Sequence, residues 1–199
     1  YYTSSIEPPG TGVTPSPAGY DSLADLITKG HAAGIEIHPW AVAFRIWTTN
    51  TGPGYHTTPE HMWWTHGPGG TNDWTMLDST GNWDFGGTSS LDPGHPAVED
   101  YLIQVYMDMI SRYDLDGFAL DYIRYPGTAW GYNPVAVARF NAEYGRTGNP
   151  SSSDTDWSNW RRDQVSNIVK RLYLETKAIK PWVKIGAAVW HTAATGNNS

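Results

Sequence analysis

The sequence predicts an α/β protein with parallel strands, of the (β/α)8 TIM-barrel-like kind. Segments with strand character alternate with segments of helical periodicity, an order typical of parallel strands joined by crossover helices. We expect strands near 35–43, 116–124 and 183–190. The three predicted strands also share one pattern of side chains, which indicates that one face of each lies beneath helices.

This pattern is clearest in the second predicted strand, where side chains point alternately to opposite faces. Phe118 and Leu120 share a bulky apolar face, whereas Gly117 and Ala119 share a face of small residues. A small inward face is typical of a (β/α) barrel, whose sites lie at the C-terminal ends of the strands. On this face four side chains follow or flank the small residues of the predicted strands: His38, Trp40, Asp121 and Trp190.

Helices are predicted at 21–33, 96–113, 134–144 and 157–178. Asp21 is suited to an N-cap, and Pro96 to the first turn of a helix. Three strands cannot close a barrel. We therefore expect residues 1–199 to form a single but incomplete barrel domain, whose open sheet edges favour self-association.

A long aromatic loop is predicted at 44–92, between the first strand and the second long helix. It is about fifty residues long, and unpatterned segments of that length are usually functional or disordered. Its tryptophans favour a functional loop, and we expect Trp63 and Trp64 to bind substrate.

The composition points to a carbohydrate partner. The 199 residues include 11 Trp and 12 Tyr but only 4 Phe. Trp and Tyr combine a flat apolar face with a polar edge, which suits sugar rings. The net charge is −7 and Lys and Arg are scattered, so nucleic acid is not an expected partner. No stretch approaches the roughly 20 apolar residues of a membrane span, and no cysteine is present for thiolate chemistry.

Asp121 is the strongest candidate for a catalytic residue. A carboxylate at the end of an apolar strand is costly to bury without a partner, so it indicates a site. Its alternative role is a structural ion pair with Arg124, and Arg124 could instead pair with Asp92 or Asp114. Three residues that follow Asp121 are expected to bind substrate: Tyr122, Arg124 and Tyr125.

The remaining strand-end residues are predicted to bind sugar. His38 could hydrogen-bond a hydroxyl group or orient Asp121, and Trp40 and Trp190 could stack on sugar rings. The alternatives are a buried, satisfied histidine and packing inside the barrel. Asp116 begins its strand, so we assign it a structural role.

Seven separated blocks carry a family resemblance: 2–8, 19–23, 34–40, 91–96, 112–126, 160–163 and 180–186. These blocks span most of the chain and occur in the family's order. They resemble the glycosyl-hydrolase-like family 10 proteins, a (β/α)8-barrel group of bacterial origin. The resemblance implies glycosidic-bond chemistry at the C-terminal face, with Asp121 as the acid of the fourth barrel strand. It also implies that the chain begins after the second barrel strand and stops after the fifth.

Glycosidic hydrolysis usually needs two carboxyl groups, one as acid and one as nucleophile or base. Asp121 fits either role. Five residues are candidates for the partner: Glu7, Glu36, Asp73, Asp78 and Asp84. Glu7 is favoured because its block, 2–8, would form a loop over the C-terminal rim of the barrel. Glu36 is a weaker candidate because it lies early in its strand, deep in the barrel.

No cofactor or metal is predicted. His56, His61 and His66 recur every five residues, which matches no compact zinc pattern. Arg161 and Arg162 are expected to be solvated at the start of the long helix. We therefore expect a secreted or cell-surface glycoside hydrolase-like protein acting on a poly- or oligosaccharide. The alternative is a noncatalytic carbohydrate-binding or self-assembling fragment of such a barrel.

Overall fold

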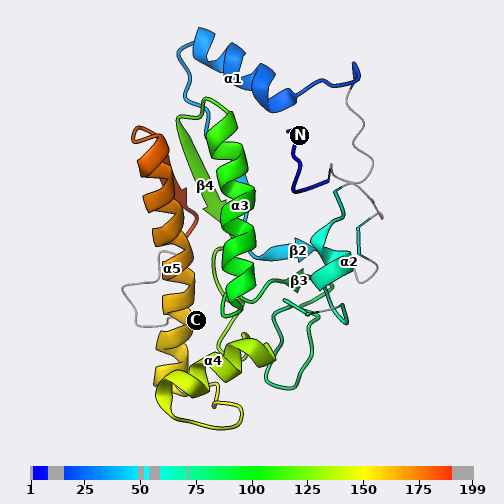
Figure 1. The fold of residues 1–199 in the computed structure, drawn as a ribbon, viewed down its shortest axis with the longest axis vertical. Coiled ribbons are helices and arrows are strands. Elements are labelled where there is room, and N and C mark those ends of the chain that lie inside the picture. Colours follow the sequence, from blue (N-terminus) through cyan, green and yellow to red (C-terminus); the bar gives the residue numbers. More distant parts are fainter. Residues whose placement is uncertain (1, 9–15, 49–51, 54–58, 71, 190–199) are drawn as a thin grey trace.

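The computed structural model describes residues 2–8, 16–48, 52–53, 59–70 and 72–189. A parallel three-stranded sheet lies at its centre, in the order β1-β4-β5. Its strands are β1 (Trp40–Val42), β4 (Gly117–Asp121) and β5 (Lys184–Ala187). In Figure 1, β4 points toward the end of the molecule that carries β2, β3, α2 and α4, while α1 lies at the opposite end. The predicted α/β class and the parallel strands are confirmed.

The strands are shorter than the predicted ranges 35–43, 116–124 and 183–190. Before β1, Pro39 has no N–H to donate to a neighbouring strand, although its carbonyl accepts the N–H of Ala119 at 2.9 Å. After β4, Tyr122 has a φ of 50°, which ends the extended conformation. Residue 190 lies outside the described residues.

All four predicted helices are confirmed, with ends shifted by at most two residues. They are α1 (Ser22–Ala32), α3 (Pro96–Arg112), α4 (Pro134–Tyr144) and α5 (Thr155–Ile179). As predicted, the Asp21 carboxylate caps α1 by accepting two backbone N–H groups, and Pro96 opens α3. His95 is the N-cap of α3, where its ring accepts the N–H of Ala97 at 3.2 Å.

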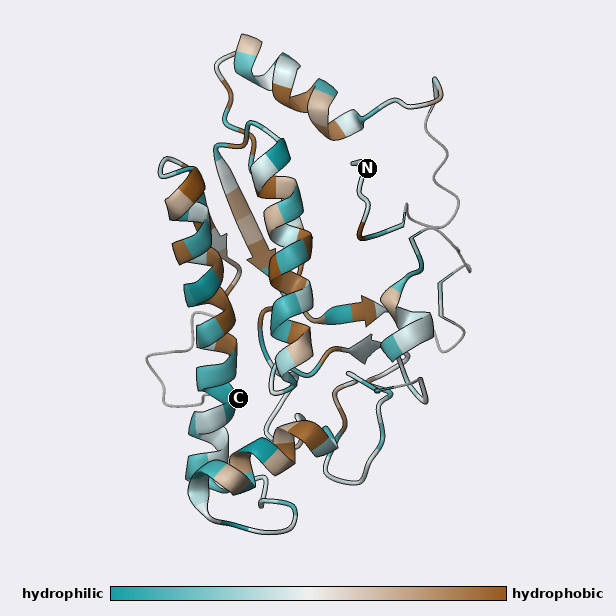
Figure 2. Cartoon of the chain, viewed as in Figure 1, coloured by the Kyte–Doolittle hydropathy of each residue, from teal (hydrophilic) through white to brown (hydrophobic). Residues whose placement is uncertain are grey.

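Helices α3 and α5 lie side by side over one face of the sheet (Figure 1). Phe118 and Leu120 of β4 are 0% exposed and belong to one core cluster with Ile110 of α3 and Leu172 of α5. Figure 2 shows β4 as largely hydrophobic, whereas α3 and α5 carry both hydrophilic and hydrophobic residues. The bulky face of β4 therefore lies beneath helices, as the side-chain alternation predicts.

Asp116, just before β4, has the structural role expected of it. Its carboxylate accepts the N–H of Ile37 at 2.7 Å and lies 2.8 Å from Nε2 of His31 in α1. These contacts fix the helix and the approach to β1 at the N-terminal end of the sheet.

A second, smaller core joins α4 to the start of α5. The rings of Trp157 and Trp160 stack with centroids 5.2 Å apart, and Phe140 of α4 meets both. These two tryptophans are 0% and 2% exposed, so they stabilise the fold and are not available to bind sugar.

The segment 44–92, predicted as a long aromatic loop, also holds short elements of regular structure. The segment contains the antiparallel pair β2 (Arg45–Trp47) and β3 (Ser89–Ser90), and the short helix α2 (Met62–His66). Trp74 is buried, and its ring stacks on that of His66 with centroids 3.7 Å apart. Such contacts join residues without helical or strand periodicity, so the periodicity of the sequence does not reveal them.

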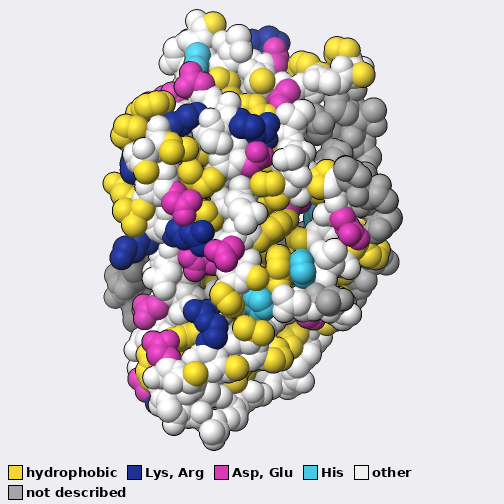
Figure 3. All heavy atoms as spheres, viewed as in Figure 1, with side chains coloured by type: hydrophobic (Ala, Val, Ile, Leu, Met, Phe, Trp, Pro, Cys, Tyr) yellow, Lys and Arg dark blue, Asp and Glu magenta, His cyan; other side chains and the backbone are white. Residues whose placement is uncertain are grey.

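Charges of both signs are interspersed over α3 and α5 (Figure 3). Arg171 of α5 illustrates this, with Nη1 2.6 Å from Asp100 and Nε 2.8 Å from Glu175. Within the described ranges, no helix is long and apolar enough to cross a membrane.

Candidate active site

The candidate site is built around Asp121, the last residue of β4. Its Oδ1 accepts the N–H of Tyr122 at 2.7 Å and lies 3.7 Å from Nη1 of Arg124. The side chain of Asp121 is 16% exposed. Arg124 therefore pairs with Asp121 in the structure, at the C-terminal end of the strand.

Tyr122 has an unusual backbone conformation directly after Asp121. Its φ of 50° is uncommon for a residue with a side chain, and such strain is often found at functional sites. The guanidinium carbon of Arg45 lies 4.1 Å from the centre of the Tyr122 ring, and that of Arg124 lies 5.0 Å from it. The ring thus contacts two cationic side chains from different parts of the chain.

A pocket of about 330 Å³ adjoins this group. Its wall is formed by Tyr122, Arg124 and Tyr125 after β4, by Arg45 of β2 and by Ser90 of β3. The short β2–β3 pair brings Arg45 and Ser90 together, because they are register partners. The C-terminal end of β4 therefore borders a hollow with two guanidinium groups.

Trp40 lies on the same face of the sheet as Asp121. It pairs in register with Ala119, and Val42 pairs with Asp121. Its side chain is exposed, with 63% of the residue accessible. The indole ring is thus exposed, and its stacking on a sugar ring stays a prediction.

The structure does not bring His38 to Asp121. The His38 ring lies over Gly117, where a Cβ atom would be 2.2 Å from its Nδ1. Its Nε2 is 3.0 Å from Oε2 of Glu36. Gly117 and Asp121 are four residues apart, about 13 Å along a strand, so His38 orients nothing at the carboxylate.

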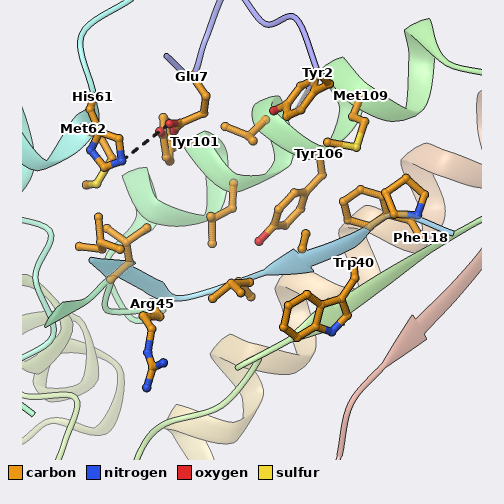
Figure 4. Close-up of a pocket in the computed structure, with 18 of the residues that line it drawn as sticks. Tyr2, Glu7, Trp40, Arg45, His61, Met62, Tyr101, Tyr106, Met109 and Phe118 are labelled. Carbon is orange, nitrogen blue, oxygen red and sulfur yellow. Dashed lines mark ion pairs between the residues drawn. The ribbon is translucent and has the colours of Figure 1, made fainter. Parts of the chain in front are cut away.

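Glu7 also lies away from Asp121. It lines a cavity of about 410 Å³ between α3 and β1, together with Tyr106 of α3. In Figure 4, Glu7 is on the α3 side of β1, whereas Trp40 and Arg45 point to the other side. Since Asp121 shares the face of Trp40, the predicted pairing of Glu7 with Asp121 across a scissile bond is not formed.

Burial raises the pKa of Glu7 to about 7. The only ion-pair contact of its carboxylate in the described part of the chain is with His61, whose Nε2 lies 4.0 Å from Oε2. Nδ1 of His61 accepts the N–H of Trp63 at 3.1 Å. In the neutral ring the proton therefore sits on Nε2, facing Glu7.

The other candidate carboxylates hold local structure. Asp73 accepts the N–H of Thr75, Asp78 that of Thr80, and Asp84 that of Gly87, at 2.6–2.8 Å. Glu36 pairs with Lys184 at 2.7 Å, near the N-terminal end of the sheet. Among the described residues, no contact joins any of the five candidates to Asp121.

The predicted aromatic ligands of sugar divide into buried and exposed residues. Trp63 is 9% exposed and meets the ring of Trp83, whereas Trp64 is 40% exposed. Tyr125 is 8% exposed and donates its hydroxyl hydrogen to Asp92 at 3.3 Å. Trp190 lies outside the described residues.

No group of three His, Cys, Asp or Glu residues suited to a metal ion occurs in the part of the chain that the structure describes. His61 and His66 have the contacts given above, and His56 lies outside the described residues. The histidine spacing thus has a structural explanation at two of its three positions.

A buried polar network lies behind the site, and the sequence did not predict it. Arg161 is 4% exposed and donates to the carbonyl of Trp130, so the expectation that it is solvated is wrong. Its guanidinium carbon lies 5.3 Å from the ring of Tyr125. Asp92 is fully buried, which raises its pKa to about 6 against the opposing hydrogen bonds from Gly94, Asn133 and Tyr125.

This network fixes the segment that follows β4. The only signal in the sequence was the turn-forming Asp92-Pro93-Gly94, which indicates a local turn and not a buried acid.

A family model for glycosyl hydrolase-like 10 proteins matches residues 5–198. The chain belongs to this family. Glycosyl hydrolase YngK of Bacillus subtilis strain 168 is 31% identical over 197 residues, which cover 95% of this chain and 34% of that protein. Glycosyl hydrolase DigH of Escherichia coli K12 is 27% identical over 191 residues, covering 90% of this chain and 39% of that protein.

This member of the glycosyl hydrolase-like 10 family thus spans about a third of the length of the curated relatives it matches. Its structure is similar to alpha-L-fucosidase isoenzyme 2 from Paenibacillus thiaminolyticus, with a TM-score of 0.59 and 18% identity. The similarity covers 86% of this chain and 23% of the fucosidase. At this identity it shows the fold alone, and it confirms a partial (β/α) barrel.

Proposed function

We propose that this chain is part of a glycoside hydrolase that cleaves glycosidic bonds in a poly- or oligosaccharide, with Asp121 as a catalytic carboxylate. The observation that carries the proposal is the place of Asp121 at the C-terminal end of β4. Catalytic residues of (β/α) barrels lie at this end of the strands. A secreted or cell-surface location belongs to the same proposal, because polymeric glycans occur outside the cell and on its surface.

In this proposal Asp121 acts as nucleophile, or as the base that activates water. The Tyr122 N–H fixes one carboxylate oxygen at 2.7 Å, which leaves the other oxygen to face the anomeric carbon. Trp40, exposed on the same face, stacks on a sugar ring. The proton donor is a second carboxyl group, since both stereochemical routes need a pair.

The test is hydrolysis of a panel of glucans, peptidoglycan and hexosamine polymers by the wild type, Asp121→Asn and Asp163→Asn. Asp163 is an exposed residue of α5, so its variant controls for the loss of one negative charge. We expect Asp121→Asn alone to lose turnover and to retain binding. Hydrolysis that survives in Asp121→Asn would disprove the assignment.

A second candidate function is noncatalytic carbohydrate binding or self-assembly. Two observations within the described residues favour it: no second carboxyl group contacts Asp121, and β1 and β5 each pair there on one side only. Unpaired strand edges can pair with another chain. Sugar binding or oligomers in sedimentation experiments, with no hydrolysis by any variant, would support this function over the first.

A further inference from the structure

The pocket beside Asp121 has a charge opposite to that of the whole chain. The chain carries a formal charge of −7, yet the described lining of this 330 Å³ pocket includes Arg45 and Arg124 and no carboxylate. The Asp121 carboxylate, 3.7 Å from Arg124, offsets one of these charges, and Arg45 leaves the hollow with a net positive potential. This contrast indicates a ligand with negative charge.

Both guanidinium groups are held in place by the fold. Arg45 is in β2, where pairing with Ser90 of β3 fixes its backbone, and its guanidinium lies on the Tyr122 ring at 4.1 Å. Arg124 is held by the same ring at 5.0 Å and by the Asp121 carboxylate at 3.7 Å. An arginine side chain has five N–H donors, and the contact of Arg45 with the face of the Tyr122 ring does not use them as hydrogen bonds, so Arg45 can donate to a ligand.

The rest of the lining suits a sugar ring. Phe44, Phe85 and the Tyr122 ring provide apolar surface, and Thr88 and Ser90 provide hydroxyl groups. Apolar faces with a few placed polar groups are typical of small-molecule sites. The pocket thus combines a surface for the ring with donors for an anion.

We infer that this pocket binds an anionic substituent, a carboxylate, sulfate or phosphate, on a sugar ring of the substrate next to Asp121. The inference rests on the proposed function, because it specifies the substrate class of the same site. The planar fork of arginine matches the geometry of such oxyanions and binds them with two hydrogen bonds. A neutral sugar in the pocket would displace water from the Arg45 guanidinium without compensating its charge.

The test is a binding measurement on matched ligands, by calorimetry or by NMR titration. Cellobiouronic acid and cellobiose differ only in one carboxylate, and glucose 6-sulfate and glucose 6-phosphate are compared with glucose. We expect the wild type to bind at least one anionic ligand at least tenfold more tightly than its neutral counterpart. Which pair shows the preference identifies the anion.

Arg45→Gln should lower the ratio of anionic to neutral affinity at least tenfold, and Arg45→Lys should restore this ratio in part. Arg162→Gln, a change at an exposed arginine of α5, is the control for net charge and should have no effect. Circular dichroism of each variant shows that it is folded.

Equal affinity for anionic and neutral ligands in the wild type would overturn the inference, and so would an unchanged preference in Arg45→Gln or no binding of either ligand. Failure of the proposed function is seen separately. Hydrolysis retained in Asp121→Asn removes the catalytic assignment without affecting the binding preference. Hydrolysis of neutral glycans without any anion preference removes the inference alone.

Discussion

Replacing Glu7 with Gln should stabilise the protein, and the effect should depend on pH. Glu7 lines the cavity between α3 and β1, where burial raises its pKa from 4.5 to about 7. In the unfolded chain the pKa of this carboxyl group returns to its ordinary value of 4.5. The folded state therefore keeps a proton that the unfolded state releases, so stability falls as the pH rises from about 4.5 to about 7 and stays lower above that.

The magnitude follows from the difference between the two pKa values. One pKa unit corresponds to about 1.4 kcal/mol, so the difference between 4.5 and about 7 corresponds to about 3 kcal/mol. Gln is neutral at every pH. Glu7→Gln should therefore raise the free energy of unfolding by up to about 3 kcal/mol at pH 8 and by less than about 0.5 kcal/mol at pH 4. A protonated His61, with Nε2 4.0 Å away, would favour the ionised carboxylate and reduce the difference.

The assay is urea unfolding of the wild type, Glu7→Gln and Glu60→Gln at pH 4, 6 and 8. Glu60 is exposed, so its variant makes the same chemical change without the burial and should stay within about 0.5 kcal/mol of the wild type. A Glu7→Gln effect of equal size at pH 4 and pH 8 would refute the reasoning. So would destabilisation at pH 8, because it would mean that the ionised carboxylate is well compensated in the fold.

Two further predictions concern packing and the buried network. Gly117→Ala should destabilise the protein by about 1–3 kcal/mol, because the new Cβ would lie 2.2 Å from the His38 ring; thermal unfolding should show most of this loss recovered when His38→Ala is combined with it. Asp92→Ala should cost about 3 kcal/mol or more, because it leaves the buried donors of Gly94, Asn133 and Tyr125 without their acceptor. Asp92→Asn should cost less, since its amide oxygen still accepts, and equal losses in the two variants would contradict this account.

The sheet and its helices were predictable because their signals are local. Phe118 and Leu120 alternate with small residues, and that alternation fixes which face of β4 meets α3 and α5. Asp21 and Pro96 mark helix starts through chemistry that acts within one turn. In contrast, Trp74 contacts His66 and also Tyr101 of α3, and no local periodicity encodes such a long-range set.

The candidate site shows the same division. Asp121 and Arg124 are three residues apart, so their pairing was open to prediction, whereas Arg45 reaches the Tyr122 ring only through the β2–β3 pair and the positive φ of Tyr122. Glu7 was expected in a loop over the C-terminal rim of the barrel. The structure holds its segment on α3 instead, through the hydrogen bond of the Ser4 hydroxyl to Asp108 at 3.1 Å.

The three strands also limit where the second carboxyl group of the proposed reaction can come from. In a (β/α) barrel, the reacting groups project from the C-terminal ends of the strands and from the loops that follow them. The last residues of β1 and β5 are Val42 and Ala187, neither of which is acidic. If Asp121 acts on a glycosidic bond, its partner therefore comes from a connecting segment or from further strands of the barrel.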